Sequence, residues 1–250
     1  MERRCGQFVR LKRLALVLPA VAGFALMSGF SALGEEGIAL AIVYDTSGSM
    51  AEGVPAGGGK SAPKYVIANK ALSAITDRIS QFAKSAPDGA PRKIEVGLFV
   101  FQGSGARAAV QYGPFDAAAI QEWVRTFSKP GGATPLGNSI KSASKSVIDS
   151  NLSHKHIVII TDGMNTSGPK PEEVVPGIKL EARKKNGEVS FHFVAFDVDA
   201  KVFDPVKKLG ATVLGASNEQ QLRSQLEFIF VKKILLEDEE PARPADVKAK

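Results

Sequence analysis

The sequence has 250 residues, of which 44% are hydrophobic and 23% are charged, which excludes a wholly disordered chain and suits one globular domain of about 200 residues. The formal net charge is +6, but residues 1–34 carry five basic residues and one acidic residue, so the remainder has a net charge of only +2. Because no block of basic residues with interleaved aromatics accompanies this small excess, nucleic acid is excluded as the expected partner.

The N-terminal segment, residues 1–34, is typical of an export signal. A basic stretch precedes the apolar run Leu14–Phe30, and small residues at Ala32 and Gly34 predict cleavage before Glu35. The apolar run has 17 residues, which is marginal for crossing a bilayer core of about 30 Å. We therefore expect a cleaved signal peptide and a periplasmic or secreted protein, with a membrane anchor as the alternative if the segment is kept.

From residue 36 onward, strand patterns alternate with amphipathic helix patterns. Continuous apolar runs such as "IALAIVYD" predict strands that are covered on both faces, and apolar residues at helical spacing predict the helices between them. The expected strands cover residues 38–45, 94–101, 106–113, 156–162, 189–199 and 211–216. The expected helices cover residues 65–82, 116–127, 134–148, 171–186 (interrupted near Pro176), 205–210 and 218–233.

This order predicts an α/β fold: a doubly wound, mostly parallel six-stranded sheet with helices on both faces. The stretch 106–113 is expected as one short antiparallel edge strand, since it follows a Gly-Ser-Gly turn. The folded domain is expected over residues 35–236, and the charged, proline-containing residues 237–250 are expected to form a flexible tail.

Oxygen-bearing side chains stand where three of these segments meet the carboxyl edge of the sheet, which is where sites lie in open α/β folds. Asp45, Ser47 and Ser49 follow the first strand in "DTSGSM", Thr134 precedes a helix in "GGATPLG", and Asp162 ends a strand in "ITDG". None of the five offers sulfur or imidazole. Such a set of hard oxygen ligands suits Mg²⁺ or Mn²⁺ rather than structural zinc.

Taken together, "DTSGSM", "GGATPLG" and "ITDG" resemble the metal-ion-dependent adhesion site (MIDAS) of the von Willebrand factor A domain family, in its bacterial type. The resemblance implies that Ser47, Ser49 and Thr134 coordinate the ion directly, and that Asp45 and Asp162 act through waters. It also implies that a protein partner completes the coordination shell with an exposed acidic residue. The family resemblance indicates a binding domain and not an enzyme.

Other interpretations compete with this one. The group Asp45, Ser47 and Ser49 could be a capped turn whose side chains bond only backbone N–H groups. "GVPAGGGKS" (residues 53–61) resembles a phosphate loop, but its first glycine is one residue too far from Gly59, so no nucleotide is expected and a flexible surface loop is the better interpretation. A serine hydrolase would need a histidine within about 3 Å of the serine, and none of the three is well placed.

Two further acids, Asp197 and Asp199, also end a strand. They could form a second cation site, although a solvated loop and a helix cap is the simpler interpretation. The predicted function is an exported domain that binds a protein partner through Mg²⁺. The alternative is an accessory or assembly factor for the maturation of an envelope or periplasmic metalloenzyme complex.

Overall fold

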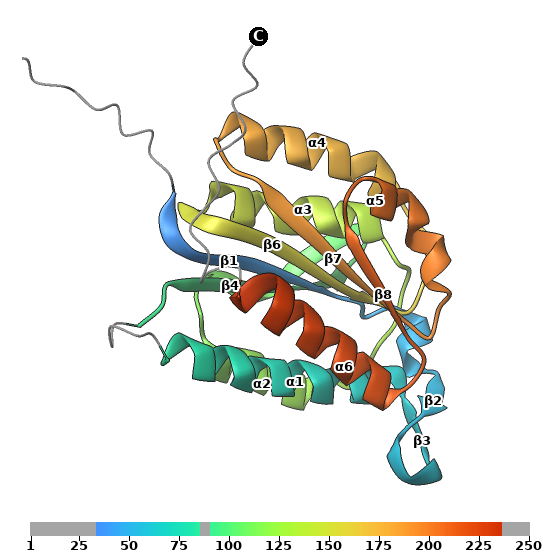
Figure 1. Ribbon diagram of the computed structural model, residues 1–250. Coiled ribbons are helices and arrows are strands. Elements are labelled where there is room, and N and C mark those ends of the chain that lie inside the picture. Colours follow the sequence, from blue (N-terminus) through green and yellow to red (C-terminus); the bar gives the residue numbers. More distant parts are fainter. Residues whose placement is uncertain (1–33, 86–90, 237–250) are drawn as a thin grey trace, which may run out of the picture. The chain divides into compact units, whose positions relative to one another are not determined.

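The computed structural model describes residues 34–85 and 91–236 (Figure 1). The predicted signal segment, apart from Gly34, and the predicted tail at 237–250 lie outside the described residues. Among the described residues, no helix combines the length and apolar character needed to cross a membrane.

The core of the fold is a six-stranded sheet. Its strands are β1 (Glu35–Tyr44), β4 (Ile94–Gln102), β5 (Gly105–Pro114), β6 (Leu152–Thr161), β7 (Val189–Phe196) and β8 (Thr212–Ala216). They lie in the order β5-β4-β1-β6-β7-β8, and every neighbouring pair is parallel except β4 and β5. The predicted sheet and its antiparallel edge strand are confirmed.

Helices cover both faces of this sheet (Figure 1). They are α1 (Lys64–Ala83), α2 (Ala117–Thr126), α3 (Leu136–Asp149), α4 (Pro171–Lys184), α5 (Asp204–Lys208) and α6 (Glu219–Phe228). Residues of β1 alternate between two hydrophobic clusters: Leu40 and Ile42 pack with α1 and α6, whereas Ala41 and Val43 pack with α3 and α4. This alternation follows from the two-residue period of a strand, and it explains why β1 is apolar at every position from Ile38 onward.

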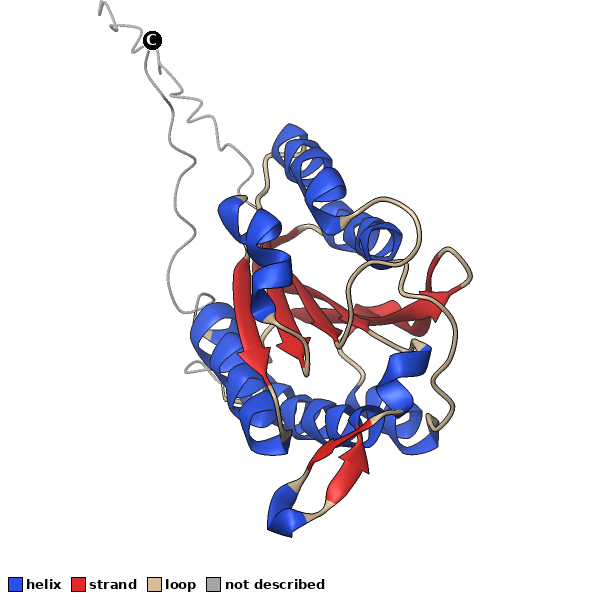
Figure 2. Ribbon diagram, turned by 90° about the vertical axis from the view of Figure 1, so that its right-hand side faces the viewer, coloured by secondary structure: helices blue, strands red, loops and turns tan. Residues whose placement is uncertain are grey.

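Three local features differ from the sequence-based expectation. The stretch 53–61, expected as a loop, contributes to a two-stranded antiparallel hairpin of β2 (Gly53–Pro55) and β3 (Ser61–Pro63), which projects from the rest of the domain in Figure 2. Val54 is buried, which anchors the hairpin at its base. Helix α4 continues through Pro176 as a single helix, and α6 continues into a π-helical segment, Ile229–Leu235.

Candidate metal centre

The register of the central strands brings two acids to the same edge. In β1, Tyr44 lies opposite Ile160 of β6, so Asp45 lies at the level of Thr161, one residue before Asp162. Two backbone bonds join the loop before α3 to the loop after β1, from Gly131 N–H to the Thr46 carbonyl at 2.7 Å and from Gly48 N–H to the Gly132 carbonyl at 3.2 Å. A third, from Thr166 N–H to the Thr134 carbonyl at 3.0 Å, joins it to the loop after β6. Three loops that are far apart in the sequence therefore meet at the carboxyl edge.

Asp45 is fully buried, and both of its carboxylate oxygens have partners. Its Oδ1 accepts the backbone N–H of Ser47 at 2.8 Å, and its Oδ2 accepts the hydroxyl of Thr161 at 2.6 Å. Burial raises the pKa of Asp45 to about 6, against the opposing effect of these hydrogen bonds. The turn interpretation is thus correct for Asp45, whose side chain holds the loop in shape.

The two serines do not follow the turn interpretation. Ser47 precedes the short 3-10 helix Gly48–Ala51, but its side chain caps no backbone N–H. Its Oγ lies 3.1 Å from the Oγ of Ser49, which donates to Oδ1 of Asp162 at 2.8 Å. In an octahedral Mg²⁺ site with bonds of about 2.05 Å, adjacent ligand oxygens lie about 2.9 Å apart. The spacing of the serine oxygens is close to that edge length, so the residues present fit such an ion.

Thr134 supplies the third hydroxyl of the candidate centre, beside those of Ser47 and Ser49. Its backbone is fixed on both sides by Thr166, whose hydroxyl accepts the Thr134 N–H at 2.9 Å and whose N–H donates to the Thr134 carbonyl at 3.0 Å. The Thr134 Oγ1 and the Ser49 Oγ lie 3.8 and 4.0 Å from the point where a Cβ on Gly163 would stand. Both hydroxyls therefore border the same small space, which the missing side chain of Gly163 leaves open.

Lys64 is part of this centre, and the sequence analysis missed it. Its ammonium nitrogen lies 3.0 Å from a carboxylate oxygen of each of Asp162, Glu52 and Asp197, and its side chain is 4% exposed. Burial works to lower the pKa of Lys64, but the hydrogen bonds with these three acids outweigh it and raise the pKa. A signal was available, since a lysine at the start of a helix faces the positive end of the helix dipole and needs compensating acids.

Of the remaining candidates, Asp197 lies at this centre, whereas Asp199 and the histidines lie outside it. Asp199 caps the short helix Ala200–Phe203 by accepting the Lys201 N–H at 3.0 Å, as expected for a helix cap, whereas Asp197 joins Lys64. His156 and His192 face each other in the core, with Nδ1 and Nε2 3.3 Å apart. Among the described residues, no group of three or more His, Cys, Asp or Glu side chains is arranged to hold a metal.

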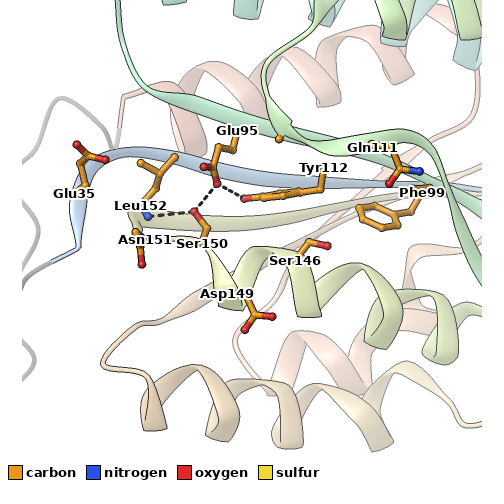
Figure 3. A pocket seen from close by; sticks show the side chains of 12 residues that line it. Glu35, Glu95, Phe99, Gln111, Tyr112, Ser146, Asp149, Ser150, Asn151 and Leu152 are labelled. Carbon is orange, nitrogen blue, oxygen red and sulfur yellow. Dashed lines mark hydrogen bonds between the residues drawn. The ribbon is translucent and has the colours of Figure 1, made fainter.

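A cavity of about 500 Å³ lies at the opposite edge of the sheet, near the start of β1 and β6 (Figure 3). There Oε2 of Glu95 accepts hydrogen bonds from the hydroxyls of Tyr112 and Ser150 at 3.0 and 2.6 Å. Burial and the neighbouring Glu95 charge raise the pKa of Tyr112. This network satisfies its own polar groups, and it contains none of the five residues of the candidate metal centre.

The fold and this edge define a class of protein: a doubly wound α/β domain with hydroxyl and carboxylate groups gathered between three loops. The sequence model of the von Willebrand factor type A domain family matches residues 39–224, and the chain belongs to this family. No curated protein sequence matches the chain.

Solved structures with a similar fold include three at low sequence identity. Proximal thread matrix protein 1 from the mussel byssus has a TM-score of 0.51 and 20% identity, and the match covers 77% of this chain and 45% of that chain. Another structure of that protein, with a zinc-occupied MIDAS motif, has a TM-score of 0.52 and 14% identity over 78% of this chain and 48% of that one. The SpRpn10 VWA domain has a TM-score of 0.53 and 11% identity, and the match covers 77% of this chain and 95% of that chain. This chain thus spans a little under half of the byssus protein and nearly all of the SpRpn10 domain.

Proposed function

We propose that this protein is an exported interaction domain that holds Mg²⁺, or Mn²⁺, at the carboxyl edge of its sheet and binds a protein partner there. The observation that carries the proposal is the arrangement of the serine hydroxyls, which lie 3.1 Å apart and are not used as caps. Membership of the von Willebrand factor type A family and the zinc-occupied MIDAS motif of the byssus protein support divalent binding at this edge.

Each residue of the centre has a distinct proposed role. Ser47, Ser49 and Thr134 would contact the ion through neutral hydroxyl oxygens. Asp45 would hold the loop through its bonds to Ser47 and Thr161, and Asp162 would orient Ser49. Because the three direct ligands carry no charge, the bound ion would supply a positive charge that favours an acidic group on the partner.

The partner is expected to present an exposed Asp or Glu. The neighbouring surface offers an apolar contact as well, because Met164, two residues after Asp162, is 61% exposed. An acidic residue beside an apolar one on the partner would match both features of this edge.

A capture experiment from envelope extract tests this function. The full chain should retain a partner in Mg²⁺ and lose it in EDTA. Thr134→Ala removes one hydroxyl ligand and should weaken binding by roughly 10–100-fold, the range seen when support of a metal site is lost. Asp199→Ala is the matched control, because Asp199 only caps a neighbouring helix. Retention that is the same in EDTA, or the same for Thr134→Ala, would contradict the proposal.

A further inference from the structure

The most unusual group near the site is the Lys64 cluster, which consists of Lys64, Glu52, Asp162 and Asp197. Lys64 is the first residue of α1, and that helix has no acidic residue in its first turn. A cation there opposes the helix dipole, which costs free energy unless other charges compensate. The compensation comes from outside the helix, from the hairpin base and from the ends of β6 and β7.

The geometry of the cluster is that of a fully satisfied ammonium ion. An ammonium has three N–H donors, and the Lys64 nitrogen has three carboxylate oxygens at 3.0 Å. Its backbone N–H also donates to the Glu52 carbonyl at 2.9 Å. Asp197 adopts a φ of 57°, which is uncommon for a residue other than glycine, so the chain accepts an unfavourable conformation where it supplies the third carboxylate.

The partner that matters most is Asp162, whose side chain is completely buried. A buried carboxylate is costly unless a charge or hydrogen bonds compensate it. Its two oxygens have different donors: Oδ1 accepts a hydrogen bond from the Ser49 hydroxyl at 2.8 Å, and Oδ2 accepts one from the Lys64 ammonium at 3.0 Å. Lys64 thus approaches from the side away from the serine hydroxyls.

We propose that Lys64 is a permanent cation of the metal centre, which neutralises Asp162 in the metal-free protein and competes with a divalent ion for the charge of that carboxylate. This inference rests on the proposed metal site. Lys64 lets the domain fold without metal and keeps metal affinity moderate, so that the ion is held firmly only when a partner adds its own acidic group.

The expected change in Mg²⁺ affinity on removal of the Lys64 ammonium follows from the different partners of the two Asp162 oxygens. Removing the ammonium leaves the Ser49 bond to Oδ1 in place, so the carboxylate keeps its orientation toward the hydroxyls. The same change frees one full negative charge beside the ion. Because that charge attracts a divalent cation directly, the gain in attraction should exceed the loss of one supporting contact.

Calorimetric titration of the full chain with Mg²⁺, together with thermal melting with and without Mg²⁺, tests the inference. Lys64→Met should melt at a lower temperature without metal, bind Mg²⁺ about 10-fold more tightly than wild type, and gain more thermal stability from Mg²⁺; coupling between two ligands is commonly of that size. Lys70→Met is the matched control, because Lys70 lies on the same helix but is 61% exposed and pairs only weakly with Glu219, at 3.5 Å. It should behave as wild type.

Glu52→Gln provides a second variant in case Lys64→Met fails to fold, since the Glu52 side chain is 68% exposed. It leaves more of the Lys64 charge uncompensated and should bind Mg²⁺ a few-fold more weakly. Suppose that wild type binds Mg²⁺. If Lys64→Met then binds it as tightly as wild type or more weakly, or if Glu52→Gln binds it more tightly than wild type, Lys64 does not compete with the ion. In that case this inference fails and the proposed function stands. If only Lys64→Met binds Mg²⁺, the inference stands and the proposed function fails. If neither binds, both fail.

Discussion

Thr161 donates its hydroxyl hydrogen to Oδ2 of Asp45 across 2.6 Å, and both side chains are fully buried. This bond ties the end of β6 to the end of β1 immediately below the candidate metal centre. Thr161→Val keeps the shape of the side chain but leaves one oxygen of a buried carboxylate without its donor. We expect the free energy of unfolding to fall by about 1–3 kcal/mol, and the Mg²⁺ affinity to fall by about 10-fold.

Urea denaturation and calorimetric titration measure these two effects. Thr126→Val is the control, because the Thr126 hydroxyl bonds only carbonyls of its own helix, at Glu122 and Trp123, and is exposed. A Thr161→Val variant as stable as Thr126→Val would show that the bond to Asp45 does not support the loop.

Gly163 offers a test of where the ion lies. A Cβ at this position would be in ordinary contact distance of Thr134 Oγ1 and Ser49 Oγ, so Gly163→Ala should fold normally. The added methyl group would border the space between the two hydroxyls, and we expect Mg²⁺ affinity to fall by about 10-fold. Gly131→Ala, which adds a methyl group with nothing within 4 Å, should not change the affinity. Equal affinities for both variants would place the ion elsewhere.

We expect the histidine pair to make the free energy of unfolding depend on pH. Burial, and secondly the charge of Lys233, lower the pKa of His192 to about 4, and burial with the neighbouring histidines lowers that of His156 as well. Between the unfolded-state value of about 6.5 and the folded-state value, the unfolded chain binds the proton, so stability falls as pH falls. For His192 the full loss is about 3 kcal/mol.

Denaturation of wild type and of His192→Gln between pH 7 and 4 measures this contribution. Asp45 acts in the opposite direction, because its folded-state pKa is raised to about 6 and its protonation favours the folded state below that value. The prediction therefore concerns the difference in free energy of unfolding between wild type and His192→Gln, which should become smaller as pH falls. His154→Gln is the control, since His154 lies at the start of β6 near Glu36. A difference that is constant with pH would contradict the prediction.

The fold could be predicted from the sequence because the patterns of apolar residues that indicate its strands and its helices are both local. Strands such as Ile38–Tyr44 are apolar at every position, and helices such as 134–148 repeat their apolar residues at helical spacing. The site candidates could be named because Asp45 and Asp162 end two apolar strand patterns abruptly and Thr134 stands at the start of a helix pattern. That Asp45 and Asp162 reach the same edge of the sheet follows from the parallel pairing of β1 and β6, whose register offsets the two acids by one residue.

The Lys64 cluster could not be predicted in the same way. Its members come from a hairpin base, a helix start and two strand ends, and their meeting depends on side-chain directions that no sequence period encodes. The hairpin was missed because its strands have three residues each and carry glycine and proline, which are typical of loops. The local signals in these segments favour a turn, but Val54 is buried and the two segments pair as strands.

The central claim is that serine hydroxyls at the carboxyl edge hold a divalent ion. Calorimetric titration of the full chain with Mg²⁺, beside the Ser47→Ala/Ser49→Ala variant, tests it most directly. We expect wild type to bind one ion per chain, the double variant to bind none measurably, and the circular dichroism of wild type to be unchanged in EDTA. Absence of binding by wild type, or equal binding by the double variant, would contradict the account.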